Sequence, residues 1–355
     1  MSAFPPSAPA RAPRRRSEVT VDLGALRRNV ARLREAAAPA EVWAVVKAGG
    51  YGHGASECAR AALAAGAQGL CVATVREGTA LRPLFPDVRM LVMGPLEPGD
   101  DSRARDAALE VAVSRPDVPA RTRVHLKVDT GMGRFGMTPD DALAVPRDAV
   151  VGLMSHLATA DEPDESFARR QLEAFRALAE RFEGVTRHVA NSAAALRFPE
   201  ARFDAVRCGI AVYGLSPFGR DPASDGLEPV LSWRSYVAQT RTLAPGESTG
   251  YGRRFVAERR TRIGLVPVGY ADGFRRGLTG TEVVVDGRRR RVVGTVSMDS
   301  FAVELEDEPE GAPVTLIGDG VLAEDHARVL GTINYEVTCG IRTAPERAER
   351  RVVDG

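Results

Sequence analysis

Apolar and polar positions follow two different patterns along this chain. Up to about residue 228, short apolar runs alternate with segments of helical composition. The apolar runs stand at 42–47, 69–73, 90–93, 109–113, 124–128, 150–154, 185–190 and 206–213. Between them, a segment such as 165–182 carries Leu172, Phe175 and Leu178 at helical spacing. About eight strands alternating with helices predict a (β/α)8 barrel. An open doubly wound sheet is the alternative, but the glycine pattern of a dinucleotide fold is absent.

One crossover of this barrel is too short for a helix. About nine residues, Pro116 and Pro119 among them, separate the apolar runs at 109–113 and 124–128. A parallel crossover takes a dozen residues or more. We therefore expect a loop in place of one barrel helix.

After residue 228 the apolar runs are separated by turns rather than by helices. They stand at 230–243, 262–268, 282–285, 291–296, 301–305 and 313–317. Asp286-Gly287 between two of them is a strong hairpin signal, and one short helix is expected near 324–330. We predict three parts: a disordered Pro- and Arg-rich tail at 1–17, the α/β barrel at 18–228 and a mostly antiparallel β domain at 229–355.

Composition excludes several classes of function. The 355 residues carry a net charge of +1, from 48 basic and 47 acidic residues. This balance argues against a broad electrostatic grip on nucleic acid or on an anionic membrane. No run approaches the roughly 18 apolar residues of a membrane span, and no secretory signal is expected. The four cysteines lie far apart without metal-like spacing, so we expect reduced thiols in a cytoplasmic protein and no metal site.

Lysine is rare enough to be informative. Of the 48 basic residues only two are lysines, Lys47 and Lys127. Arginine replaces lysine wherever a positive charge suffices, but only lysine readily loses its proton to form a Schiff base or a carbamate. Lys47 ends an apolar strand, and a glycine-rich loop follows it at 49–54. Catalytic groups of barrels sit at this end of the strands, so we expect a lowered pKa and carbonyl reactivity. A lysine snorkelling from the strand end is the structural alternative.

The segment AVVKAGGYGHG around Lys47 resembles the cofactor-lysine motif of the alanine racemases, which are fold-type III pyridoxal-phosphate (PLP) enzymes. Seven more segments resemble blocks of this family, in family order. They are HLKVDTGMGRFG, GLMSHLATAD, RHVANSAA, RCGIAVYG, STGYGRRF, VPVGYADGF and VGTVSMDSF. The resemblance runs from about residue 18 to residue 341, and eight ordered motifs make it highly specific.

This resemblance implies a set of catalytic roles. Lys47 would hold PLP as a Schiff base and act as one of two bases, and Tyr251 would be the second base on the opposite face of the cofactor. His156 and Arg207 would help the tyrosine, whose ordinary pKa near ~10 makes it a poor base. Arg207 would also face the pyridine nitrogen, where most PLP enzymes place a carboxylate. Such an arginine favours racemisation over transamination.

The same resemblance implies binding roles for further residues. Tyr51, Asn191, Ser192, Gly209 and Ile210 would hold the cofactor phosphate, which fits the phosphate sites of barrels. Ser192 as a plain helix N-cap is the alternative.

For the substrate, Arg134 would clamp the carboxylate. Lys127, at a position that is often carbamylated in the family, would orient this arginine, unless it is simply paired to an acid. Met298, Tyr270 and Asp299 would lie near the substrate. The family works as a head-to-tail homodimer, so Tyr251 and Met298 would serve the partner's active site. The implied reaction is the interconversion of L-alanine and D-alanine, a step of D-alanine biosynthesis.

The chain departs from the family in the lysine motif, in a barrel that is trimmed between 113 and 124 and between 136 and 151, and most of all at its C-terminus. Gly49-Gly50 stands where the family usually has Asn-Ala, and no tyrosine follows Tyr335, although the family tends to end in a tyrosine-bearing stretch. A racemase for another amino acid such as serine therefore stays open. So do a decarboxylase, which Arg207 disfavours, and a cofactor carrier with little turnover. A Schiff-base aldolase would explain Lys47 but not the β domain.

Overall fold

The computed structural model describes residues 15–355, and the chain divides into two compact units. We call Leu23–Glu228 the barrel unit; the β unit combines 229–355 with the described residues up to Asp22. The barrel unit thus begins at Leu23 and not at residue 18, because the strand at 18–22 pairs within the β unit.

Most of the expected N-terminal tail, residues 1–14, lies outside the described residues. Its last residues are ordered, contrary to that expectation. Ser17 is fully buried, and Arg16 donates from Nε to the carbonyl of Pro267 at 2.9 Å. The reason is that β1 (Glu18–Asp22) is paired on both sides in the β-unit sheet, with β10 and β19, so the residues just before it are held against that sheet.

Eight parallel strands form the barrel, as expected. They are β2 (Glu41–Val45), β3 (Gly69–Val72), β4 (Arg89–Val92), β5 (Glu110–Val113), β6 (Val124–Lys127), β7 (Val150–Met154), β8 (Thr186–His188) and β9 (Ala205–Cys208). From β2 to β8 each strand pairs with the next one in the chain, and β9 pairs with β2, so that β8 and β9 are the two ends of the sheet. Backbone hydrogen bonds also join the segments around β8 and β9, with Arg207 donating to the carbonyl of Ala190 at 3.0 Å. The sheet is therefore nearly closed.

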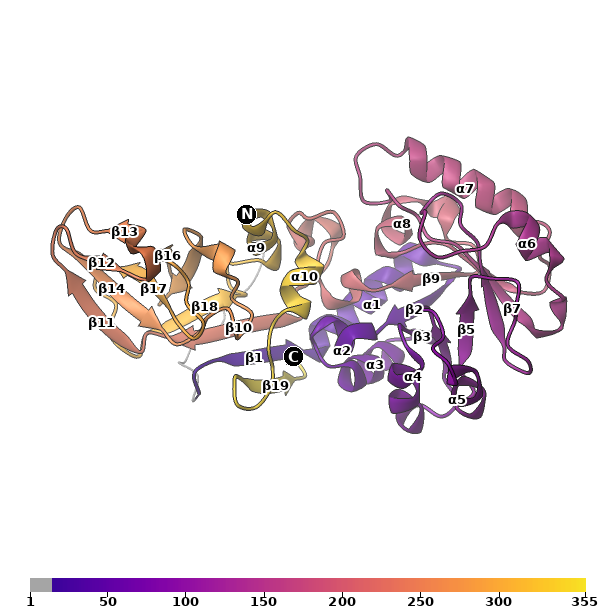
Figure 1. Ribbon diagram of the computed structural model, residues 1–355, viewed down its shortest axis with the longest axis horizontal. Coiled ribbons are helices and arrows are strands. Elements are labelled where there is room, and N and C mark those ends of the chain that lie inside the picture. The colour runs from indigo at the N-terminus through magenta and orange to yellow at the C-terminus, as the bar shows by residue number, and fades with distance from the viewer. Residues whose placement is uncertain (1–14) are drawn as a thin grey trace. The chain divides into compact units, whose positions relative to one another are not determined.

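Helices lie on the outside of the barrel, except the short turn α2 at the end of β2 (Figure 1). They are α1 (Leu23–Ala37), α2 (Lys47–Tyr51), α3 (Ala55–Ala64), α4 (Val75–Leu81), α5 (Asp100–Asp106), α6 (Pro139–Ala144), α7 (Ser166–Ala179) and α8 (Ser192–Arg197). Short 3-10 turns add η1 (Arg82–Leu84), η2 (Arg147–Ala149), η3 (Pro199–Ala201), η4 (Ile210–Tyr213) and η5 (Pro222–Asp225). Residues 114–123, all of them described, form a loop between β5 and β6. The expected loss of one barrel helix is thus confirmed.

The β unit is built on a nine-stranded sheet in the order β11-β14-β17-β16-β15-β18-β10-β1-β19. Its members are β1, β10 (Leu231–Tyr236), β11 (Gln239–Leu243), β14 (Thr261–Val266), β15 (Glu282–Val285), β16 (Arg288–Val293), β17 (Phe301–Leu305), β18 (Pro313–Ile317) and β19 (Glu349–Val353). Every pair is antiparallel except β1 with β19. Smaller elements are β12 (Ser248–Thr249), β13 (Phe255–Val256), η6 (Tyr251–Arg253), η7 (Arg276–Leu278), α9 (Ala323–Leu330) and α10 (Asn334–Cys339).

The expected hairpin at Asp286-Gly287 joins β15 to β16. Both turn residues are left-handed, with φ of 46° at Asp286 and 80° at Gly287. This is the geometry that a two-residue hairpin needs, and Asp-Gly adopts it at low cost.

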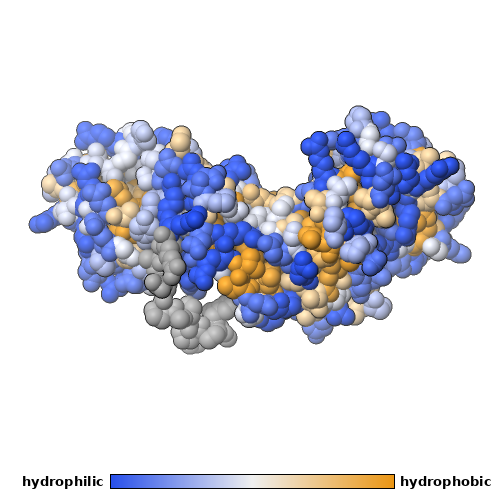
Figure 2. All heavy atoms as spheres, turned by 90° about the horizontal axis from the view of Figure 1, so that it is seen from below, coloured by the Kyte–Doolittle hydropathy of each residue, from blue (hydrophilic) through white to orange (hydrophobic). Residues whose placement is uncertain are grey.

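Hydrophilic side chains cover most of the face that Figure 2 shows, and apolar side chains gather there in a few separated patches. Within residues 15–355, no helix is both long and apolar enough to cross a membrane. None of the four cysteines is in a disulfide; Cys58, Cys71 and Cys208 are buried and Cys339 is exposed.

Candidate active site

A cavity of about 230 Å³ opens where several barrel strands end. Lys47 follows β2 into it, and Lys127 and Met154 are the last residues of β6 and β7. Its lining consists of Lys47, Met93, Gly94, Lys127, Arg134, Phe135, Met154, His156 and Arg207. Five of the residues singled out in the sequence therefore meet in one cavity, although 160 positions separate Lys47 from Arg207 (207 − 47).

The chain turns sharply in a left-handed sense directly after Lys47. Ala48, Gly49 and Gly50 have φ of 53°, 63° and 66°. The amide of Ala48 donates to Oε1 of Glu77 at 2.7 Å, and this bond fastens the turn to α4. Consecutive left-handed residues favour glycine because it has no Cβ to clash. The Gly49-Gly50 departure is therefore compatible with the turn that presents Lys47.

Positive charge dominates the cavity. Four of the nine lining residues are basic and none is a carboxylate. Burial, together with the charges of Arg207 and Arg134, lowers the pKa of Lys127 to about 8. Burial and the charge of Arg207 likewise lower the pKa of His156 to about 3. His156 is therefore neutral at physiological pH, and the cavity suits a ligand that carries carboxylate or phosphate groups.

Arg134 stands on a loop that a single carboxylate holds together. Asp129 accepts the backbone N–H groups of Gly131, Met132 and Gly133 at 2.8–3.2 Å. These bonds, rather than burial, lower the pKa of Asp129. At Gly136 a Cβ would lie 2.5 Å from the amide nitrogen of Asp129, so the loop closes only around glycine. Asp129 thus positions Arg134, a role that sequence reasoning missed.

Ser192, Gly209 and Tyr51 form a second polar corner of the barrel unit. Oγ of Ser192 accepts the amides of Gly209 at 3.0 Å and Ala211 at 3.4 Å. A Cβ on Gly209 would lie 2.3 Å from the Tyr51 hydroxyl, so only glycine fits beneath that ring. Ile210 begins η4, where the first N–H groups of a helical turn are without intrahelical partners. Four of the five expected phosphate ligands thus meet at this corner.

Asn191, not Ser192, is the N-cap of α8. Its Oδ1 accepts the amide of Ala194 at 3.0 Å. The alternative that Ser192 is a plain cap is therefore wrong. Asn191 directly precedes Ser192, the first residue of α8, whose Oγ bonds to Gly209.

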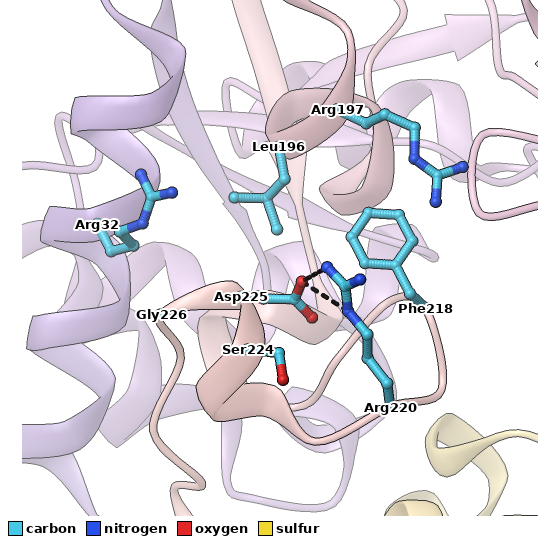
Figure 3. Close-up of a pocket in the computed structure, with 8 residues that line it drawn as sticks. All are labelled: Arg32, Leu196, Arg197, Phe218, Arg220, Ser224, Asp225 and Gly226. Carbon is cyan, nitrogen blue, oxygen red and sulfur yellow. Dashed lines mark hydrogen bonds and ion pairs between the residues drawn. The ribbon is translucent and has the colours of Figure 1, made fainter. Parts of the chain in front are cut away.

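A larger hollow of about 420 Å³ in the same unit has different chemistry (Figure 3). Its lining residues are Arg32, Leu196, Arg197, Phe218, Arg220, Ser224, Asp225 and Gly226. Arg220 is paired with the buried carboxylate of Asp225, and Arg197 donates to the carbonyls of Ala160 and Glu162. Its arginines are thus engaged with the protein, and none of the lining residues is a lysine, histidine or cysteine. We therefore place the candidate site in the smaller cavity.

The remaining candidates belong to the β unit. Tyr270 lies on one loop and Met298 and Asp299 lie on another, and backbone hydrogen bonds join the two loops. Tyr270 donates its amide to the carbonyl of Ser297 at 3.0 Å, and Ala271 donates to that of Met298 at 3.0 Å. A Cβ on Gly269 would lie 2.3 Å from the Ser297 carbonyl oxygen, so glycine permits this approach. The side chains of Tyr270 and Met298 stay 42% and 52% exposed.

The backbone of Tyr251 is hydrogen-bonded, whereas its ring is exposed. Thr295 donates from Oγ1 to the Tyr251 carbonyl at 2.8 Å, while 72% of Tyr251 is exposed. Tyr251 therefore adjoins the 295–299 loop that carries Met298 and Asp299. Large exposed apolar and aromatic side chains grouped on a few loops are typical of an interaction surface. Each unit thus assembles its own subset of the expected residues.

Sequence reasoning did not single out three buried polar residues of the barrel interior, Glu110, His125 and His188. His188 bonds directly to Arg207 through Nδ1 at 2.7 Å. A signal existed for His125, because it lies two positions before Lys127 on one strand and therefore on the same face. Glu110 and His188 contact His125 from other strands, so no periodicity within one segment points to them.

Two family models match the chain. The N-terminal domain of alanine racemase covers residues 21–217, and the C-terminal domain covers residues 230–350. The boundary between the two matches lies close to the boundary between the barrel unit and the β unit.

Individual relatives match over almost the whole length. The alanine racemase of Streptomyces coelicolor is 42% identical over 368 residues, 92% of this chain and 94% of that protein. The solved alanine racemase from Streptomyces coelicolor A3(2) superposes with a TM-score of 0.89 at 38% identity, covering 96% of this chain and 98% of that one. The Bartonella henselae alanine racemase, solved with covalently bound pyridoxal phosphate, gives 0.88 at 26% identity, covering 95% and 99%.

Proposed function

Because the chain belongs to the alanine racemase family, we propose that it is a PLP-dependent racemase that interconverts L-alanine and D-alanine. The observation that carries this proposal is the cavity in which Lys47, Arg134 and Arg207 meet without a carboxylate. A lysine that can form a Schiff base there faces two fixed cations that suit an anionic substrate and cofactor.

The residues present fit pyridoxal phosphate. Ser192, the Gly209 backbone, Ile210 and the Tyr51 hydroxyl form a polar corner for the phosphate, where the glycine leaves room under Tyr51. Nη1 and Nη2 of Arg207 donate to protein acceptors, whereas no acceptor from residues 15–355 is bonded to its Nε–H. That N–H is available to the pyridine nitrogen. When bound, the cofactor supplies a ring that accepts the electron pair left on the α-carbon.

Two bases exchange the α-proton from opposite sides. Lys47 Nζ takes or returns it on one face, and Tyr251 Oη does so on the other, so that the proton can return with inverted geometry. Arg207 remains protonated, although burial lowers its pKa to about 10. A protonated arginine, unlike a carboxylate, cannot stabilise a protonated pyridine nitrogen. Delocalisation into the ring would therefore be limited, which favours prompt return of a proton to the α-carbon.

The substrate carboxylate pairs with Arg134, whose loop Asp129 holds. Lys127 Nζ lies 5.5 Å from the centre of the Phe135 ring, beside this arginine in the lining. A carbamate on Lys127 would give Arg134 a carboxylate partner and fix its fork toward the substrate.

We further propose a head-to-tail homodimer that is cytoplasmic and supplies D-alanine. The exposed Tyr251, Tyr270 and Met298 of the β unit support the dimer. In such a dimer they serve the partner's Lys47, and their apolar surface is covered.

The decisive experiment is proton NMR of the PLP-loaded protein with L-alanine in heavy water, with chiral analysis of the product. We expect loss of the α-proton signal and formation of D-alanine, both abolished in Lys47→Ala. Exchange on another amino acid but not on alanine would overturn the substrate, and full activity of Lys47→Ala would overturn the mechanism. Release of carbon dioxide would favour the decarboxylase, and bound cofactor with no exchange on any amino acid would favour the carrier.

A further inference from the structure

We propose that Glu110, His125 and His188 form a one-way hydrogen-bond relay that positions Arg207 and holds its guanidinium as a donor toward the active site. The relay rests on the proposed function, because Arg207 is the residue that would face the cofactor ring. None of the three residues lines the cavity. They are positioning residues that act through Arg207.

The relay crosses the barrel interior from β5 to β9. Nε2 of His125 lies 2.8 Å from Oε2 of Glu110, and Nδ1 of His125 lies 2.7 Å from Nε2 of His188. Nδ1 of His188 lies 2.7 Å from Nη1 of Arg207. Three short bonds therefore connect a carboxylate to the guanidinium through both nitrogens of two imidazoles.

The chemistry of the two ends determines the direction of every bond. An ionised Glu110 can only accept, so His125 must donate from Nε2. A neutral His125 is then unprotonated at Nδ1 and accepts from Nε2 of His188. His188 in turn is unprotonated at Nδ1, which is the only state that accepts a bond from the arginine. Both histidines are thus neutral Nε2–H tautomers.

The charges around the relay support these protonation states. Burial raises the pKa of Glu110, but the bonds from His125 and Arg89 outweigh it and hold the pKa at about 2. Arg89 contacts Oε2 of Glu110 at 2.8 Å, whereas Arg123 contacts Oε1 from an exposed position and is not among the groups that lower this pKa. Burial lowers the pKa of His125, and burial with the charge of Arg207 lowers that of His188 well below its ordinary value. Neither imidazole carries a charge at neutral pH.

The barrel interior is shaped to hold these rings. A Cβ on Gly152 would lie 2.0 Å from Nδ1 of His125, so β7 admits this imidazole only with glycine there. Trp43 lies against both rings, with centroids 5.0 Å from His188 and 5.8 Å from His125. Both histidines are fully buried. The rings cannot rotate freely, so a tautomer change at one of them must be transmitted to the next.

The function of the relay follows from what its reversal would do. If His125 carried its proton on Nδ1, His188 would have to accept at Nε2 and carry its own proton on Nδ1. Two donors, Nδ1–H of His188 and Nη1–H of Arg207, would then face each other at 2.7 Å. The guanidinium would move, and its Nε–H would leave the position that faces the cofactor ring. Glu110 prevents this reversal from the far side of the barrel.

The first test uses the unmodified protein without cofactor. The chain has five histidines, so nitrogen-15 NMR of histidine-labelled protein resolves few rings, which are assigned by replacing the other histidines in turn. We expect His125 and His188 to be neutral Nε2–H tautomers from pH 6 to pH 8. An Nδ1–H tautomer or an imidazolium at His188 would overturn the proposal. This result depends on no activity, so it is distinct from any failure of the racemase assignment.

The second test is Glu110→Gln, which keeps the shape and removes the charge. Its amide can donate to His125 and so permits the reversed relay. We expect mixed tautomers at His188, a shifted pH profile of the bound cofactor's visible absorbance, and a roughly 10- to 100-fold fall in kcat, the scale found for groups that orient a functional ligand.

Arg123→Ala is the matched control. It removes an exposed partner of the same carboxylate and leaves the relay intact, so tautomers, spectrum and kcat should stay as in the unmodified protein. If Glu110→Gln shows altered tautomers but unchanged kcat and spectrum, the relay is only structural and the proposal fails. If that variant does not fold, the tautomers of the unmodified protein decide.

Discussion

Arg347 donates from Nη1 to the carboxylate of Asp299 at 2.6 Å, so a residue near the end of the chain holds the loop that carries Met298. Arg347 also reaches Asp272 at 3.4 Å, and Arg16 contacts the same two acidic residues from the N-terminal side. Both ends of the β unit therefore converge on the loops of Tyr270 and Met298.

Arg347→Ala tests this arrangement. Because the 297–300 loop loses an anchor while the bases stay in place, we expect a roughly two- to fivefold rise in KM for alanine and little change in kcat. Steady-state kinetics measure it. Arg288→Ala is the control. Arg288 begins β16 and pairs with Asp307, which follows β17, so this ion pair lies outside the 297–300 loop. An unchanged KM in Arg347→Ala would show that the ion pair does not hold the loop.

Ser192→Ala should weaken cofactor binding. The change removes the acceptor of two backbone amides, those of Gly209 and Ala211, and a buried donor left without a partner costs about 1–3 kcal/mol. We expect a roughly tenfold or greater rise in the dissociation constant of pyridoxal phosphate, measured by absorbance titration. Ser224→Ala is the matched control, because Ser224 lines the larger hollow. Equal effects of the two changes would contradict our placement of the phosphate.

Lys127 should react with bicarbonate. Burial and two neighbouring arginines lower its pKa to about 8, so the neutral amine that attacks carbon dioxide is well populated near pH 8. We expect a carbamate signal in carbon-13 NMR with labelled bicarbonate, growing from pH 7 to pH 9. Lys127→Arg leaves Lys47 as the only lysine, so it is a clean control. A signal that persists in this variant would assign the carbamate elsewhere.

Two inactive variants should complement each other. If each site combines Lys47 of one subunit with Tyr251 of the other, a heterodimer of Lys47→Ala and Tyr251→Phe chains holds one intact site. Random pairing then restores roughly one quarter of the unmodified activity in co-expressed protein. The separately purified variants, assayed alone, set the baseline. No recovery would mean that both bases come from one chain.

Acid should destabilise the fold below about pH 6.5. Burial lowers the pKa of His156 to about 3 and that of His326 to about 4, from an ordinary value of 6.5. The unfolded chain therefore binds more protons below pH 6.5, so this stability is fully present above that pH. It is lost as the pH falls toward the folded-state values.

Each such group adds about 1.4 kcal/mol per pH unit to the slope. Unfolding curves of the cofactor-free protein between pH 7 and pH 5 measure this slope. His326→Gln should reduce the slope without removing it. A stability that is flat across this range would contradict the assignment of neutral buried histidines.

Much of the fold could be predicted from local pattern. The barrel strands, the missing helix between 113 and 124, and the Asp286-Gly287 turn all follow from apolar periodicity, chain length and turn chemistry. Each of these signals depends only on residues that are close together in the sequence, so it can be recognised without the tertiary structure. β1 could not be assigned this way, since five alternating residues fit either unit and only pairing with β10 and β19 decides.

The sequence by itself determined the family, through ordered motifs, and the two informative lysines, through the rarity of lysine among 48 basic residues. The resemblance singles out Arg207 among 46 arginines (48 − 2), and only the tertiary structure shows what its guanidinium contacts. It also decided that Asn191 caps α8 and that Glu110 reaches Arg207 through two imidazoles. The physical reason is that hydrogen bonds depend on atoms within about 3 Å. Closing the barrel brings together side chains that no sequence period connects.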